Sequence, residues 1–171
     1  MSWTDFYRRR DAIDQVLAHA RRHDDAGLPF EELPAVRAVF GSRAELALAL
    51  QYKWSQALTG RVSVALADAE RAPDVDHVEA VANAWRATAR ANPVLRRLLD
   101  EHEPDDEFRA AVRAEQRMLA YAAGLADVTE PAGEAARVGA AFLALIRGTP
   151  DHTPRHANPI EQLFRRLVAS A

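Results

Sequence analysis

The sequence predicts an all-α fold, a bundle of about seven to eight helices. Apolar residues recur at helical intervals along most of the chain, and no stretch alternates apolar and polar residues with a strand period. Pro, Gly, Asn and Asp divide the apolar stretches into segments of helix length. The length of 171 residues suits one hydrophobic core, so we expect a single domain over residues 1–171.

Apolar residues at helical spacing predict a first helix from Trp3 to about His23. The residues that follow, 28–40, are short and broken because Pro34 limits any helix there. Gly41 then interrupts the chain. We therefore treat residues 1–41 as a distinct N-terminal region and residues 42–171 as the main helical region.

The main region begins with a capping box at Ser42 and Glu45. The Ser42 hydroxyl is expected to accept a bond from the N–H three residues on, and Glu45 to reach back to the N–H of Ser42. The predicted helix runs to about Ala72 and is the longest in the chain. Its buried stripe repeats every four residues through Leu46, Leu50, Trp54, Leu58, Val62 and Leu66.

The remaining segments predict five further helices. Asp74 is the expected N-cap of the next helix, which ends at Asn92 because the residue before a proline avoids the α region. Pro93 opens a short helix. Further helices are expected from Asp106 to about Leu125, from Pro131 and Gly133 to about Arg147, and from Asn158-Pro159 onward.

The composition limits the classes of function. The formal net charge is −3, without the basic surplus that nucleic-acid-binding domains usually carry. The absence of cysteine excludes a thiol nucleophile, a disulfide and a Cys-ligated metal. No signal peptide and no apolar run of membrane-spanning length is found, so we expect a cytoplasmic protein without a membrane partner.

Residues 39–46 read Val-Phe-Gly-Ser-Arg-Ala-Glu-Leu and lead into the predicted long helix. They resemble the junction between the helix-turn-helix and the long linking helix in the TetR family of ligand-responsive repressors. Residues 84–99 and 108–113 look like the middle of its ligand domain, and residues 139–148 like its penultimate helix. The resemblance implies a TetR-like bundle with a ligand-binding and dimerisation region at 42–171.

The N-terminal region departs from that family pattern. A helix-turn-helix needs a support helix, a turn and a recognition helix, and residues 27–40 are too few for all three. We therefore expect a TetR-like regulatory or small-ligand-binding protein without sequence-specific DNA binding. The basic clusters Arg8–Arg10 and Arg21–Arg22 would contact phosphates or simply form a solvated helix face.

Aromatic residues and one acid on the apolar stripes are candidates for a pocket that would take an apolar or aromatic small ligand. The alternative is ordinary core packing, which large aromatic side chains commonly provide. Glu115 interrupts an apolar stripe, so a buried carboxylate there would need a partner. The candidate pocket residues are Trp54, Trp85, Glu115, Met118, Tyr121 and Phe142.

The last two predicted helices are candidates for a homodimer interface. The final helix is apolar over a wide arc, and the TetR resemblance implies that these two helices pair across a two-fold axis. The alternative is that both helices close the core of the monomer. The candidate interface residues are Phe142, Ile146, Ile160, Leu163, Phe164 and Leu167.

We predict no catalytic residues, no metal site and no cofactor. His152 and His156 are four residues apart, but Thr153-Pro154 between them disfavours the helix that this spacing would need to bind zinc. No phosphate-binding loop or nucleophile–base pattern occurs. Two alternatives stay open, a helical interaction adaptor without a small ligand and a metal-dependent helical enzyme.

Overall fold

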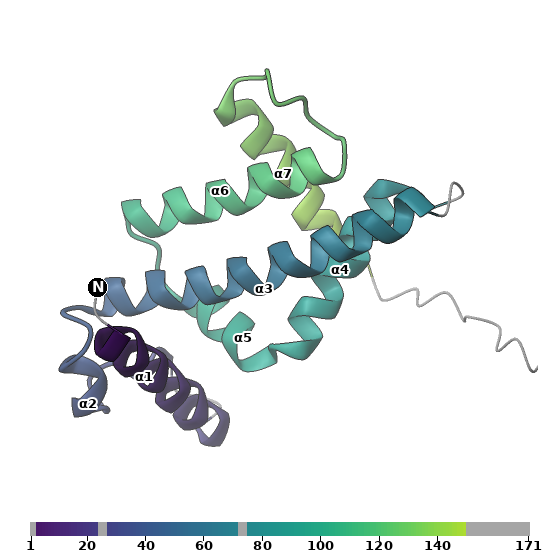
Figure 1. Ribbon diagram of the computed structural model, residues 1–171. Coiled ribbons are helices and arrows are strands. Elements are labelled where there is room, and N and C mark those ends of the chain that lie inside the picture. The colour runs from purple at the N-terminus through teal and green to yellow at the C-terminus, as the bar shows by residue number, and fades with distance from the viewer. Residues whose placement is uncertain (1–2, 24–26, 72–74, 150–171) are drawn as a thin grey trace, which may run out of the picture.

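The computed structural model describes residues 3–23, 27–71 and 75–149. Every regular element in these ranges is a helix, which confirms the all-α fold (Figure 1). None of these helices is both long and apolar enough to cross a bilayer. The helices are α1 (Trp3–Arg22), α2 (Pro34–Arg37), α3 (Arg43–Arg71), α4 (His77–Ala91), α5 (Pro93–Glu101), α6 (Asp106–Ala122) and α7 (Ala132–Gly148).

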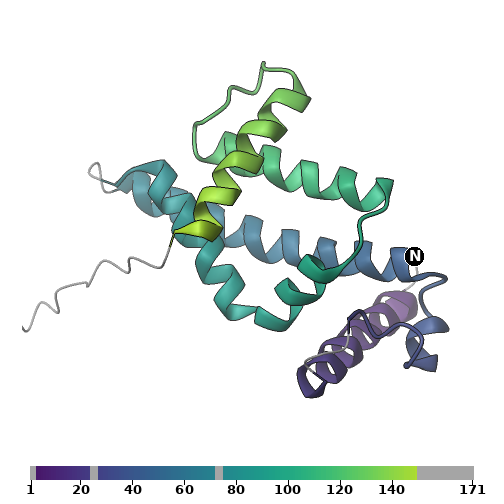
Figure 2. The ribbon, with the colours of Figure 1, turned by 180° about the vertical axis from the view of Figure 1, so that it is seen from behind.

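The long helix α3 runs through the middle of the molecule and organises the rest. Helices α4 and α5 pack along one side of it, and the α6–α7 pair lies along the other (Figures 1 and 2). Helix α1 crosses near the beginning of α3 and also packs against α2 and α5. The core lies around α3, because each of these layers turns its apolar face toward that helix.

The start of α3 confirms Ser42 as its cap and corrects the role of Glu45. The Ser42 hydroxyl accepts a hydrogen bond from the Glu45 N–H at 3.1 Å. The Glu45 carboxylate accepts from the N–H of Gly41 at 2.9 Å, one residue before the expected donor. The same carboxylate pairs with Arg9 of α1 at 2.8 Å, so it ties the two helices together.

Two other helix ends differ from the predicted ones. The carboxylate of Asp76, not Asp74, caps α4 by accepting from the Val78 N–H at 3.1 Å. Helix α6 ends three residues before Leu125, because Gly124 takes a left-handed conformation with φ of 68°. The N–H of Leu125 then bonds to the carbonyl of Ala120 at 2.9 Å, which closes the helix end.

Helices α6 and α7 approach each other closely at Gly139. A Cβ atom at this position would lie 1.8 Å from the backbone carbonyl oxygen of Gln116. Only a residue without a side chain allows this approach. The glycine therefore fixes how the α6–α7 pair packs.

The N-terminal region holds one short helix between α1 and α3. Residues 27–42 contain only the four-residue α2, and Pro34 is its first residue. The guanidinium of Arg9 lies 4.7 Å from the centre of the Phe40 ring. The guanidinium of Arg97 donates to the carbonyl of Ala20 at 2.7 Å, which joins α5 to the end of α1.

Candidate functional site

A buried polar pair joins α3 to α6 in the middle of the molecule. The amide nitrogen of Gln51 donates to the carboxylate of Glu115 at 2.7 Å. The two residues are only 1 % and 6 % exposed, respectively. The second carboxylate oxygen of Glu115 and the amide oxygen of Gln51 have no hydrogen-bond partner among the described residues. Glu115 thus has the hydrogen-bond partner that its buried position required. That partner binds only one of the two carboxylate oxygens.

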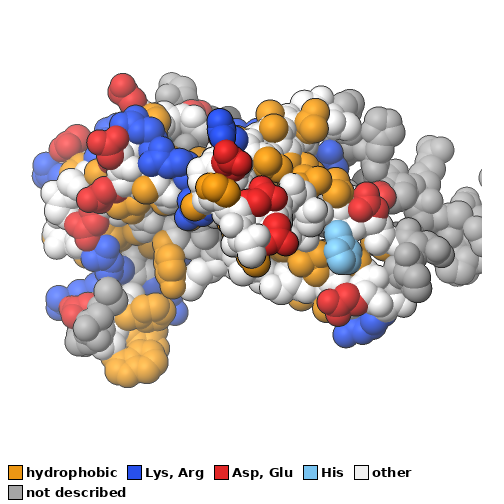
Figure 3. Space-filling view, turned by 90° about the horizontal axis from the view of Figure 1, so that it is seen from above, with side chains coloured by type: hydrophobic (Ala, Val, Ile, Leu, Met, Phe, Trp, Pro, Cys, Tyr) orange, Lys and Arg blue, Asp and Glu red, His pale blue; other side chains and the backbone are white. Residues whose placement is uncertain are grey.

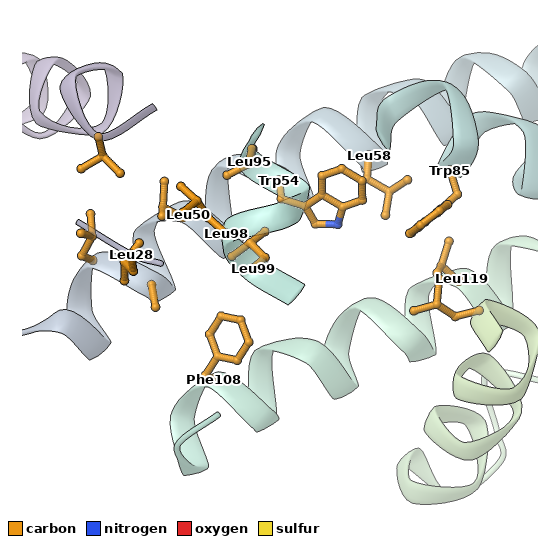
Figure 4. Close-up of a cluster of buried hydrophobic side chains, with 14 of the residues drawn as sticks. Leu28, Leu50, Trp54, Leu58, Trp85, Leu95, Leu98, Leu99, Phe108 and Leu119 are labelled. Atoms are coloured by element: carbon orange, nitrogen blue, oxygen red, sulfur yellow. The ribbon is translucent and has the colours of Figure 1, made fainter. Parts of the chain in front are cut away.

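Two tryptophans lie next to this pair. Trp54 is one helical turn after Gln51 on α3, and its ring meets that of Trp85 of α4 edge to face, with centroids 5.9 Å apart and an interplanar angle of 72°. Both rings are buried, and neither indole N–H has a partner within the described residues. The indole nitrogen of Trp54 lies on the side of its ring that faces α6 (Figure 4).

Gln51, Trp54, Trp85 and Glu115 are together called the polar centre below. They present two unpartnered acceptor oxygens and two unpartnered donor N–H groups inside an apolar core. Leaving one such group unsatisfied costs about 1–3 kcal/mol. Native interiors keep few groups of this kind, so these four need an explanation.

An ion-pair network covers the outer faces of the two indoles. The guanidinium of Arg96 lies 4.7 Å from the centre of the Trp54 ring, and that of Arg147 lies 5.4 Å from the centre of the Trp85 ring. Asp100 binds both arginines, with oxygen–nitrogen distances of 3.0 Å and 3.1 Å. This network joins α5 to α7 and holds the two rings from outside.

The layers on the two sides of α3 meet only in part. Helix α4 contacts α6 and α7, whereas α5 and α6 both pack against α3 but not against each other. Large side chains fill the interior between the layers, among them Leu98, Leu99, Phe108 and Leu119 (Figure 4). A ligand at the polar centre would therefore have to displace side chains rather than backbone.

Comparison of the chain with protein-family models, with curated proteins and with solved structures gave no match. The TetR resemblance therefore stays a prediction from the sequence.

Most of the predicted pocket residues lie in or against the hydrophobic core, so the pocket stays a prediction. Phe142 of α7 belongs to the same core cluster as Trp54 and Trp85, and Met118 of α6 packs against that cluster. Tyr121 of α6 is half-buried. Sequence reasoning missed Gln51, although a polar residue beside the apolar stripe of the longest helix was a signal that could have identified it.

The predicted interface residues on α7 face inward. Phe142 and Ile146 are buried in the core of their own chain, whereas Leu145 between them is 68 % exposed. A partner at this helix would contact Leu145 rather than the two predicted residues. The other predicted interface residues, Ile160, Leu163, Phe164 and Leu167, lie outside the described residues.

A groove between α1 and α3 is a second candidate site. It has a volume of about 580 Å³. Phe6 lines the groove and is exposed, and its ring contacts those of the exposed Trp3 and Tyr7, with the three ring centroids 5.7–6.4 Å apart. Figure 3 shows hydrophobic side chains exposed on the surface. The lining residues are Phe6, Arg9, Arg10, Ile13, Glu45, Leu48, Ala49, Tyr52, Lys53 and Gln56.

The cations of this groove already have partners. Arg9 pairs with Glu45 at 2.8 Å, Arg10 with Asp11 at 3.6 Å, and Lys53 with Asp14 at 3.7 Å. Two residues of the basic cluster Arg8–Arg10, Arg9 and Arg10, therefore pair with acids. Among the described residues, no group of three or more His, Asp or Glu side chains could hold a metal ion, and His152 and His156 lie outside those residues.

Proposed function

We propose that the protein is a TetR-like regulatory protein that binds a small apolar or aromatic ligand at the polar centre. The observation that carries this proposal is the set of unpartnered buried groups on Gln51, Trp54, Trp85 and Glu115. Small-ligand sites combine mainly apolar walls with a few polar groups that orient the ligand, and the polar centre has that composition.

A structural role for the Gln51–Glu115 pair is the competing explanation. A buried polar pair can fix the register of two packed helices at some cost in stability. That role needs the hydrogen bond between α3 and α6 alone. It does not account for the unpartnered acceptor oxygens of Gln51 and Glu115, which a ligand donor or water would satisfy.

In this proposal the protein does not itself bind DNA in a sequence-specific way. Residues 27–42 hold only the four-residue α2, which is too short to serve as a recognition helix in the major groove. The net charge of −3 also disfavours phosphate binding. Titration with genomic fragments at physiological salt should give no sequence-selective binding, and nanomolar selective binding would contradict this part of the proposal.

The ligand site can be tested through the three indole N–H groups in proton–nitrogen correlation spectra. We expect the neutral aromatic probe 2-phenylethanol to move the signals of Trp54 and Trp85. The signal of Trp3 is the internal control, because this side chain is 77 % exposed on α1. A shift of Trp3 alone, or no shift up to the solubility limit of the probe, would refute binding at the polar centre.

The α1–α3 groove favours a second candidate function, a helical adaptor that binds an apolar helix of a partner protein. Exposed aromatic residues beside an apolar hollow are typical of helix-in-groove recognition. In this case Leu48→Asp should abolish capture of the partner, whereas Glu115→Gln should not affect it. The reverse pattern, with ligand binding weakened only in Glu115→Gln, supports the small-ligand function.

A further inference from the structure

We infer that the ligand of the polar centre is an amine: a small apolar or aromatic molecule whose ammonium group binds Glu115 and Gln51. This inference rests on the proposed function and adds the chemical class of the ligand. It follows from three features of the site, which are the isolation of the carboxylate, the engagement of the nearby arginines and the orientation of the Gln51 amide.

The carboxylate of Glu115 is buried without a counter-ion. Its one hydrogen-bond partner among the described residues is the neutral amide of Gln51, and no Lys, Arg or His there pairs with it. An ionised carboxylate removed from water is strongly unfavourable unless it is paired. A ligand cation would supply the missing charge in the place where the protein supplies none.

Two arginines that contact the tryptophans are bound elsewhere. Arg96 and Arg147 both bind Asp100, and they cover the faces of Trp54 and Trp85 rather than Glu115. These two cations thus lie against the indole rings and do not pair with the buried Glu115 carboxylate. This distribution of charge disfavours an anionic ligand at Glu115.

The amide orientation of Gln51 adds a second acceptor. The amide nitrogen of Gln51 is the atom that donates to the Glu115 carboxylate, at 2.7 Å. The amide oxygen is therefore left as an acceptor without a partner, like the free carboxylate oxygen. An ammonium group has several N–H donors and can bind both oxygens, whereas a hydroxyl group has one donor.

The test compares three probes with the same ring and different head groups: 2-phenylethylammonium, 2-phenylethanol and phenylacetate. Their affinities for the full chain are measured by calorimetry at neutral pH. We expect the ammonium compound to bind at least about tenfold more tightly than the alcohol, because a hydrogen bond to a charged group is stronger than one between neutral groups. Phenylacetate should bind most weakly.

Glu115→Gln removes the charge and keeps the shape of the side chain. In this variant the advantage of the ammonium compound over the alcohol should fall to less than about threefold, because only neutral acceptors remain. Glu107→Gln is the matched control, since Glu107 is an exposed carboxylate on the same helix, and it should keep the wild-type ratio. A melting curve establishes that each variant is folded.

The outcomes separate the ligand class from the proposed function. Equal affinity for ammonium and alcohol in the wild-type protein, or tighter binding of phenylacetate, overturns the amine class and leaves the ligand site intact. Failure of all three probes to bind overturns the proposed function itself. The wild-type ratio decides the class even if Glu115→Gln does not fold.

Discussion

His102 shows how one residue can make stability depend on pH. Its ring packs edge to face against Phe108 with centroids 4.7 Å apart, and its Nε2 atom is buried without a partner among the described residues. Burial lowers the pKa of His102, and the positive charge of Arg43 lowers it further, while Asp105 and Glu103 act in the opposite direction. Because the folded-state pKa lies below the unfolded one, protonation favours unfolding.

We therefore expect His102 to stabilise the protein fully above its ordinary pKa of about 6.5 and progressively less as the pH falls below it. The measurement is the free energy of unfolding of wild type and His102→Asn between pH 7.5 and 5. The wild type should lose more stability than the variant over this range. If both lose the same amount, the burial of His102 has no effect on stability, and titrating carboxylates account for the change.

At the scale of helices, the close approach at Gly139 gives a prediction with an internal control. Gly139→Ala should destabilise the protein by about 1–3 kcal/mol, because the new Cβ would overlap the Gln116 carbonyl and push α7 from α6. Gly60→Ala, at an exposed position of α3 with open space around the new Cβ, should stabilise the protein by about 0.5–1 kcal/mol. The free energy of unfolding of each variant is measured by chemical denaturation. Equal changes in Gly139→Ala and Gly60→Ala would contradict the packing argument.

The Asp100 network gives a second prediction at this scale. Asp100→Asn should lower the free energy of unfolding by about 1 kcal/mol, because it weakens two ion pairs that join α5 to α7 over the indole rings. The control is Asp68→Asn, whose exposed pair with Arg71 at 2.8 Å lies within α3. Its effect should stay within about 0.5 kcal/mol. If Asp68→Asn lowered the free energy of unfolding more than Asp100→Asn, the ion pairs between α5 and α7 would have no special importance for stability.

At the scale of the whole molecule, helical periodicity was enough to predict the fold class and the order of the helices. The Ser42 cap and the boundary at Asn92-Pro93 were also predictable, because their chemistry is local. The hydrogen bond between Gln51 and Glu115 was not, since its partners are 64 residues apart. The same reason applies to Asp100, whose link to Arg147 depends on tertiary packing.

The oligomeric state is the remaining prediction for the whole molecule. The resemblance implies a homodimer through the C-terminal helices, and on α7 the exposed apolar side chain is that of Leu145. We expect Leu145→Asp to convert a dimer into a folded monomer in sedimentation experiments at micromolar concentration. Phe142→Asp should instead unfold the chain, because it places a charge in the core. A wild-type monomer would end the dimer proposal.

The edge-to-face contact of Trp54 and Trp85 also has an optical consequence. Transition dipoles of two rings at 5.9 Å couple, so the protein should show a circular dichroism signal in the near ultraviolet that depends on their mutual angle of 72°. Trp3, on the surface, adds emission at longer wavelength that iodide quenches, whereas the buried pair is shielded. The unlabelled chain thus carries its own reporter of any rearrangement between α3 and α4.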